Sequence, residues 1–342
     1  MKKTFLSIIF ISAVSAAFFV SCSKKEAKKE EPKEVTAYSY DSFAGEWGAA
    51  AEIARLFEEE TGYRLNVINC GEAVSVLGRA VEEKYSVKAD VIIGIDNNLA
   101  SRARSEGILS PYIPTGSENI SYRLFKELGG DNLLTPYDYA HFAVIYNKNS
   151  GIPAPESLED LTKDIYKGKI ALMDPRTSTV GLGFLSWTVS VYGDNAPDYW
   201  KRLAPSILSL TPGWSSGWGM FTKGEVPLVI SYTTSPASII EYDGKDYAQA
   251  LVFEQGHVEQ VEGIGILKNA PNRKGAELFV DFFISEKAQA LLPLTQWMNP
   301  ANRVADLPEC YKKGAPVPEV TLETYSEKTM SLLEQSVEAL AK

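Results

Sequence analysis

The chain has 342 residues and a formal net charge of −10, with 44 acidic against 34 basic side chains. Such an excess of negative charge repels phosphate backbones, so nucleic acid is excluded as an expected partner. The only histidines are His141 and His257, which excludes a histidine-rich metal site.

The amino-terminal segment has the order of a secretion signal. Lys2 and Lys3 precede an apolar run over 5–20, and Cys22 follows closely. A charged start before an apolar run is typical of a signal peptide, and a cysteine at its end resembles the lipid-attachment site of a lipoprotein. The alternative is a transmembrane helix, but the run is shorter than the ~20 apolar residues that a span requires. We therefore expect residues 1–21 to be a signal peptide and Cys22 to carry a lipid that anchors the exported protein at a membrane, in the periplasm or cell envelope.

Residues 22–34 consist mainly of Lys, Glu, Ala and Pro and show no apolar pattern. A segment of this composition buries too little surface to fold, so it predicts a lipidated tether. Roughly 300 residues remain, which by usual domain sizes favours two compact lobes over one core. Cys70 and Cys310 lie in this part without the spacing of a metal site, and the sequence leaves open whether they pair.

Strand and helix patterns alternate in the first part of the folded chain. They predict strands at 35–40, 64–69 and 89–95, and helices at 50–57, 74–83 and 98–106. Because this alternation favours parallel strands covered by helices, the segment predicts one α/β lobe.

A second α/β pattern begins after residue 136. It predicts strands at 139–146, 170–173 and 226–232 and a helix at 181–192. A strand at 257–266 and helices at 274–283, 285–292 and 323–341 are expected to return to the first lobe. The predicted fold is two-lobed: a first lobe at 35–138 and 262–342 and a second at 139–261, each a mainly parallel sheet flanked by helices, with a cleft between them.

Polar loops follow the first three predicted strands. They carry Tyr40 with Trp47 close behind, Glu72, and the segment 96–98. Ligands bind beyond the carboxyl ends of parallel strands, although the same residue types also cap helices and form turns. The shared edge of the sheet favours binding.

The second lobe offers a site for an anion and a set of aromatic rings. Ser178 and Thr179 open the helix at 181–192, where they either cap it or bind a phosphate-sized group. Trp214, Tyr232 and Trp297 lie in predicted loops. These rings either plug a core or, together with Glu72, bind a planar cation by stacking and cation–π attraction.

The chain resembles the thiamine-binding proteins of ABC importers, in the type II periplasmic-binding-protein class. The matching stretches run in order at 38–43, 88–91, 96–99, 174–179, 213–215, 231–237 and 297–298. The resemblance implies a type II fold and, as ligand, thiamine, thiamine monophosphate or thiamine diphosphate. It also implies an ABC permease and, through it, the ATPase as partners, with no enzymatic activity, cofactor or metal. We further expect a monomer.

The resemblance also implies residue roles. Trp214, Tyr232 and Trp297 would contact the thiamine rings. Ser178 and Thr179 would meet the phosphate end, whereas Tyr40 and Trp47 would line the side of the first lobe. Pro236, in the loop after Tyr232, completes the expected ligand-binding set.

Two positions depart from the family. Glu72 stands at an acidic position but is one methylene longer than the usual residue, and Ser238 stands where an aromatic residue can occur. The resemblance further implies a hinge between the lobes, expected at 138–146 and 257–263, that closes on ligand.

Two other functions are weighed. A serine hydrolase would use Ser215, because residues 213–217 fit G-x-S-x-G and His257 follows later, but the preceding strand pattern is weak for a nucleophile elbow. A ferric-ion or other small-solute carrier of the same fold is the closer alternative. Iron-binding relatives use paired tyrosines, whereas Tyr232 is followed by Thr233.

Overall fold

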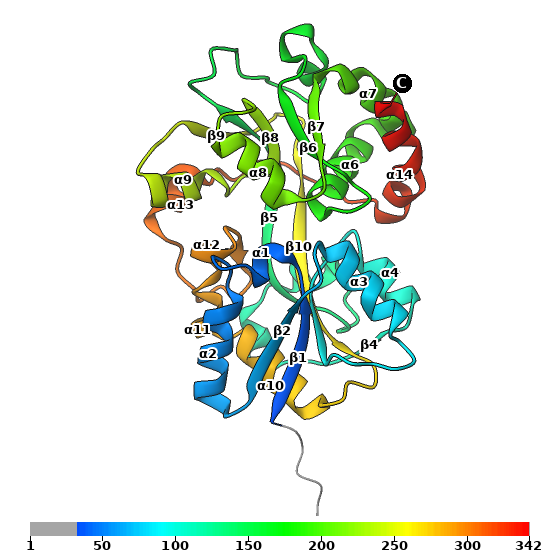
Figure 1. The fold of residues 1–342 in the computed structure, drawn as a ribbon, viewed down its shortest axis with the longest axis vertical. Coiled ribbons are helices and arrows are strands. Elements are labelled where there is room, and N and C mark those ends of the chain that lie inside the picture. Colours follow the sequence, from blue (N-terminus) through cyan, green and yellow to red (C-terminus); the bar gives the residue numbers. More distant parts are fainter. Residues whose placement is uncertain (1–32, 342) are drawn as a thin grey trace, which may run out of the picture. The chain divides into compact units, whose positions relative to one another are not determined.

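The computed structural model describes residues 33–341 (Figure 1). The predicted signal peptide at 1–21, the lipid-attachment residue Cys22 and the tether up to residue 32 lie outside this range. Within the described range, no helix is both long and apolar enough to cross a membrane.

Three parallel strands form the centre of the first lobe, as the sequence predicted. β1 (Glu34–Ser39) pairs with β2 (Arg64–Asn69) and with β3 (Val91–Asp96). The helix α2 (Ala50–Thr61) buries Ile53 and Phe57, and it ends at Gly62, whose φ of 72° lies in the left-handed region that suits glycine. Phe57 packs edge-on against Phe279 of α10 (Arg273–Phe283), at 5.2 Å between ring centroids.

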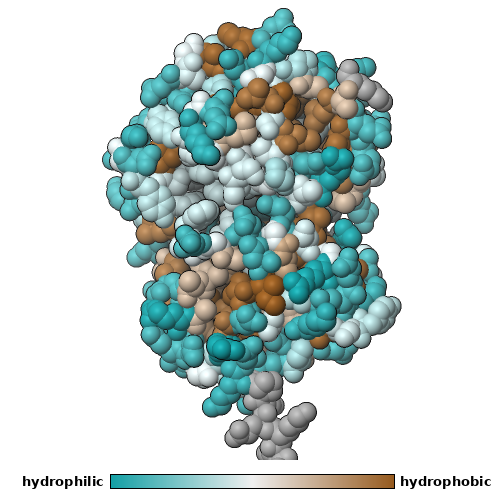
Figure 2. Space-filling view, viewed as in Figure 1, coloured by the Kyte–Doolittle hydropathy of each residue, from teal (hydrophilic) through white to brown (hydrophobic). Residues whose placement is uncertain are grey.

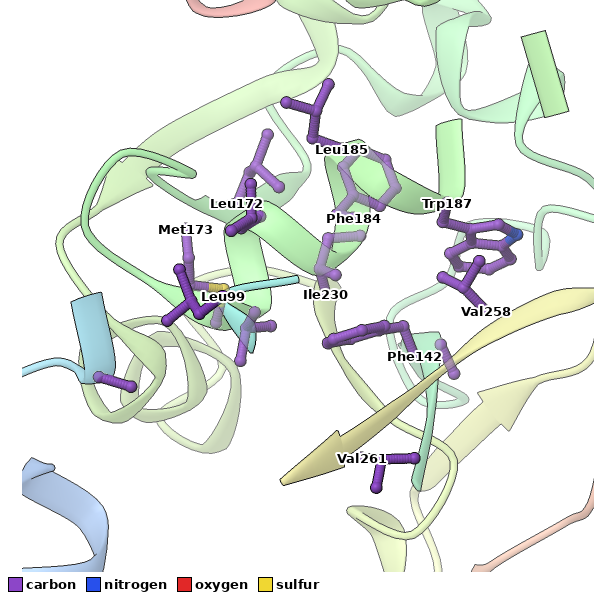
Figure 3. Close-up of a cluster of buried hydrophobic side chains, with 14 of the residues drawn as sticks. Leu99, Phe142, Leu172, Met173, Phe184, Leu185, Trp187, Ile230, Val258 and Val261 are labelled. Carbon is purple, nitrogen blue, oxygen red and sulfur yellow. The ribbon is translucent and has the colours of Figure 1, made fainter. Parts of the chain in front are cut away.

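A second group of parallel strands forms the centre of the second lobe: β6 (Ile170–Met173), β7 (Ile207–Thr211) and β8 (Leu228–Tyr232). The helix α6 (Thr179–Tyr192) packs against β6 and β8 and is buried over most of its length, because its residues are apolar or small on every side. Figure 3 shows Phe142, Phe184 and Trp187 among the apolar side chains that gather in this core.

Two long strands belong to both lobes. The first part of β5 (Thr135–Asn147) pairs with β10 (His257–Leu267), in a register that sets Asp138 opposite Glu262. The second part pairs with β8, where Phe142 stands opposite Tyr232. Figure 1 shows both strands running from one lobe into the other. The segments expected to cross between the lobes are therefore continuous strands rather than loops.

The last helix of the chain lies on the second lobe and not, as the sequence suggested, on the first. α14 (Ser326–Leu340) packs against α6 and α7 (Ala196–Leu203), and Figure 1 shows it beside them. It does so because its buried side chains, Leu333 among them, meet the apolar face of that helix pair. The helix α13 (Glu309–Gly314) packs against α9 (Pro236–Asp243). The expected placement of the carboxyl-terminal helix is wrong, and the exact lobe boundaries stay a prediction.

The remaining elements are short or flank these sheets. They are α1 (Asp41–Ala44), α3 (Ala73–Glu82), α4 (Ala100–Ser105), β4 (Leu109–Ser110), α5 (Tyr122–Glu127), α8 (Trp214–Thr222), β9 (Ala248–Leu251), α11 (Glu286–Gln289), α12 (Leu292–Thr295), β11 (Asn299–Pro300) and β12 (Thr321–Leu322). On the face drawn in Figure 2, the surface is largely hydrophilic and its apolar patches are separate from one another.

Candidate functional site

A cavity of about 350 Å³ lies where the loops and helices of the two lobes face each other. Seven of the nine predicted ligand-binding residues line it: Tyr40, Trp47, Glu72, Thr179, Trp214, Tyr232 and Trp297. The other two lie behind its wall. Ser178 is fully buried at the start of α6, and Pro236 is buried as the first residue of α9.

Two tryptophans form one wall of the cavity. Trp214 and Trp218 are four residues apart on α8, so they project from the same face, and their rings stack with centroids 5.7 Å apart at 11°. The indole nitrogen of Trp214 donates to Ser231 Oγ at 2.8 Å, which fixes the orientation of the ring. The sequence pattern predicted a loop at 213–218 and indicated no role for Trp218. Both the helix α8 and its second tryptophan were therefore missed.

Tyr232 lies at the carboxyl end of β8 with its ring stacked on Phe142, at 5.3 Å between centroids. Its hydroxyl donates to Gln260 Oε1 at 2.6 Å, and Gln260 Nε2 donates to Asp96 Oδ2 at 2.8 Å. Asp96 also accepts the backbone amides of Asn98 and Leu99. The loop at 96–98 therefore braces the residues behind Tyr232 and does not line the cavity, contrary to its expected place in the site.

Trp297 has a backbone conformation that is rare for a bulky residue. Its φ is 57°, in the left-handed region, and its buried indole makes an edge-to-face contact with Tyr242, with centroids 5.3 Å apart. Tyr242 lines the cavity one helical turn after Ser238, and its hydroxyl donates to the Leu294 carbonyl at 3.1 Å. The aromatic ring that Ser238 lacks is thus supplied four residues later on the same helix.

An acidic pair lies at the base of the cavity. Glu262 on β10 lines it and accepts from the Tyr40 hydroxyl at 3.3 Å, while Asp138 is opposite Glu262 on β5. Burial and mutual repulsion raise the pKa of Asp138 well above its usual value, and burial raises that of Glu262. The sequence missed both residues, because acids within strand patterns normally face solvent; two acids on strands otherwise apolar were the available signal.

Glu72 is the second carboxylate of the lining. It precedes α3 in the first lobe, and burial together with the charge of Asp41 raises its pKa to about 7, against a smaller opposing effect from Ser178. Asp41 itself accepts a hydrogen bond from Ser215 Oγ of the second lobe at 3.2 Å. Glu72 and Asp41 of the first lobe therefore each interact with a serine hydroxyl of the second lobe.

The charged side chains that line the cavity are all acidic. The lining contains Glu72 and Glu262, several aromatic rings, and no Lys, Arg or His among the described side chains. Within residues 33–341, no group of three or more acidic, histidine or cysteine side chains is arranged to hold a metal ion. The arrangement suits a flat organic cation, which stacks on the rings and pairs with a carboxylate.

The hydrolase alternative fails on geometry. Ser215 is in the first turn of α8, with its hydroxyl bonded to Asp41. His257 is fully buried in β10, where one ring nitrogen contacts the Phe142 carbonyl and the other accepts from the Phe253 amide. His141 is also buried, with its Nε2 bonded to Thr321 Oγ1 at 2.7 Å, so neither histidine contacts the serine. The two cysteines whose pairing the sequence left open, Cys70 and Cys310, are both free thiols.

Comparison with known proteins identifies the family of the chain. A family model for bacterial extracellular solute-binding proteins matches residues 86–328. A thiamine-binding periplasmic protein of Brucella abortus is 36% identical over 316 residues, 91% of this chain and 92% of the relative. One from Salmonella typhimurium is 38% identical over 291 residues, 84% of this chain and 86% of the relative.

A solved structure described as a periplasmic thiamin binding protein matches with a TM-score of 0.83 at 34% identity, covering 90% of this chain and 96% of that one. The predicted two-lobed type II periplasmic-binding-protein fold is confirmed, and the chain is a solute-binding protein rather than an enzyme. It belongs to the family of bacterial extracellular solute-binding proteins and, within that family, groups with the relatives named thiamine-binding periplasmic proteins.

Proposed function

We propose that this protein captures thiamine, or one of its phosphate esters, in the cavity between its lobes and delivers it to an ABC importer in the membrane. The observation that carries the proposal is the cavity lining, in which aromatic rings and two carboxylates are present without a basic side chain. Thiamine is a flat ring system with a permanent positive charge, so such a lining complements it by stacking, cation–π attraction and ion pairing. The names of the relatives support the same ligand.

Delivery depends on closure of the two lobes. A ligand that touches both Tyr40 of the first lobe and Trp214 of the second binds the closed form more tightly than the open one, and this difference shifts the population toward the closed form. The permease, and through it the ATPase, then recognises the closed protein. The Ser215–Asp41 hydrogen bond is an example of a contact that exists only when the lobes are close.

The cellular setting is part of the proposal. We place the protein in the periplasm or cell envelope as a monomer, held to a membrane by a lipid on Cys22 after removal of residues 1–21. The charged-then-apolar order of the amino terminus supports this assignment. Mass spectrometry of the membrane fraction would test it, because a lipidated Cys22 must be the first residue of the mature chain.

Titration calorimetry and tryptophan fluorescence with thiamine test the ligand. We expect saturable binding at one site, and Trp214→Ala should weaken it by about 5- to 30-fold, because a stacked indole contributes on the order of 1–2 kcal/mol. Tyr85→Phe provides the matched control, since Tyr85 is 94% exposed and lies outside the cavity. The proposal is lost if the purified protein binds none of thiamine, its monophosphate and its diphosphate.

A ferric-ion carrier remains the alternative of the same fold. The Tyr232 hydroxyl is bonded to Gln260 and its ring is stacked on Phe142, so this side chain is committed to the wall of the cavity. We expect no visible tyrosinate absorption on addition of Fe(III) citrate. A strong purple or red colour that disappears in Tyr232→Phe would favour iron instead.

A further inference from the structure

Glu72 reaches from one lobe into the other. It immediately precedes α3 in the first lobe, yet its carboxylate touches Gly213 of the second lobe so closely that a methyl group at position 213 would overlap it. Ser178, also of the second lobe, interacts with the same carboxylate. Glycine at 213 is therefore a packing requirement, and the space that it leaves is filled by Glu72.

The place that Glu72 reaches is one that suits an anion. α6 is 14 residues long, and its first turn leaves backbone amides without acceptors inside the helix. Ser178, at the start of this helix, is fully buried, and its hydroxyl has no hydrogen bond of ordinary length among residues 33–341. A buried hydroxyl at the start of a helix requires an acceptor, and the Glu72 carboxylate, with which Ser178 interacts, is the acceptor at hand.

No basic side chain among the residues lining the cavity offsets this arrangement. Arg176, close to the start of α6, is half exposed and paired with Asp174 at 2.6 Å. Asp41 and Glu262 add negative charge on the side of the first lobe. A phosphate group entering here displaces the Glu72 carboxylate and lies close to the charge of Asp41, without a lysine or arginine from the lining to compensate.

We propose that the Glu72 carboxylate occupies the anion-binding end of α6 in the closed protein, so that the cavity selects the unphosphorylated cation over its phosphate esters. The inference rests on the proposed function and narrows it. The length of the side chain is essential, because a glutamate is one methylene longer than an aspartate at the same position. Ser178 thereby serves the protein's own carboxylate instead of a phosphate of the ligand.

The experiment is a calorimetric comparison of thiamine, thiamine monophosphate and thiamine diphosphate at one pH and salt concentration. We expect the wild-type protein to bind thiamine at least about tenfold more tightly than either ester. Glu72→Gln keeps the length and removes the charge, and Glu72→Asp keeps the charge and withdraws it from α6. In each variant, the ratio of the dissociation constants of the monophosphate and of thiamine should decrease by about tenfold.

Glu58→Gln is the matched control, because Glu58 is exposed on α2 and its replacement changes the net charge by the same amount. Its ratio should equal that of the wild type. Two results would overturn the inference and leave the proposed function intact. In the first, the wild-type protein binds thiamine but binds the esters equally well or better. In the second, the ratio of the dissociation constants of thiamine and its monophosphate is the same in both Glu72 variants as in the wild type. Failure of all three compounds to bind would remove both.

Discussion

At the scale of single residues, the acidic pair at the base of the cavity links stability to pH. Glu262 and Asp138 are opposite each other on neighbouring strands, and burial raises the pKa of both. An acid whose pKa is higher in the folded than in the unfolded chain keeps a proton that the unfolded chain releases. Its contribution to stability therefore declines as the pH rises from the ordinary value of about 4.5 toward the raised one.

Glu262→Gln should consequently stabilise the ligand-free protein at pH 8 by roughly 1–3 kcal/mol and have a much smaller effect at pH 5, because the glutamine carries no charge to bury. Urea unfolding at the two pH values measures the difference. Glu58→Gln, on an exposed surface, should stay within about 0.5 kcal/mol at both. A destabilised Glu262→Gln protein at pH 8 would contradict the account.

Glycines at two helical positions should respond in opposite ways to the same substitution. Gly183 of α6 has no room for a methyl group, because one would overlap the ring of Phe142, and Phe142 supports Tyr232 in the cavity wall. We expect Gly183→Ala to destabilise the protein by about 1–3 kcal/mol. A methyl group added at Gly78 of α3 would have no atom within 4 Å, so Gly78→Ala should be neutral or stabilising by up to ~1 kcal/mol. Chemical denaturation of both variants measures the two changes in the free energy of unfolding. Equal changes would show that the contact between position 183 and Phe142 does not determine the stability.

At the scale of elements, α14 is held on the second lobe by a small apolar surface. Leu333 is 9% exposed and packs among the residues of α6 and α7. Leu333→Ala should therefore lower the free energy of unfolding by about 2–3 kcal/mol, whereas Ser331→Ala on the exposed side should change it by less than about 0.5 kcal/mol. Equal stability of the two variants would mean that α14 is not docked as described.

The sequence predicted most elements where the apolar pattern was strong and local. The strand at 64–69 coincides with β2, and the helix expected at 181–192 begins two residues earlier as α6. It missed α8, because three glycines and two serines lie around its tryptophans and lower its helix propensity, which tertiary packing overrides. It misplaced α14 because an amphipathic pattern shows that a helix has a buried face but not which neighbour covers it.

The same distinction applies to the site. Aromatic residues in segments predicted as loops were visible in the sequence, and Trp214, Tyr232 and Trp297 do line the cavity. The places of Glu262 and Tyr242 in the lining could not be predicted, since they depend on strand register and on the turn of the helix, although an acid within an apolar strand pattern was a signal. The reach of Glu72 across the cavity depends on how two lobes meet, which no local pattern contains.

At the scale of the whole molecule, binding should be visible as compaction and as added stability. If thiamine bridges the two lobes, small-angle scattering should show a smaller radius of gyration with ligand than without, because closure brings the lobes together. Ligand at 100 times its dissociation constant should raise the free energy of unfolding by about 2.7 kcal/mol. Trp214→Ala at the same ligand concentration should show less of both changes. An unchanged radius with saturating ligand would indicate that the lobes are already closed in the free protein.

β5 and β10 pass between the lobes as uninterrupted strands, and the pairs formed along β5 belong first to one sheet and then to the other. If either sheet unfolded, half of β5 would therefore lose its hydrogen-bonded neighbours while the other half remained paired in the second sheet. The two halves should then melt together, giving a single calorimetric peak, and a gene fragment encoding one half alone should yield insoluble chains. In such a molecule, the lobes open and close by twisting of the strands that they share. No intermediate with one folded and one unfolded lobe should be populated.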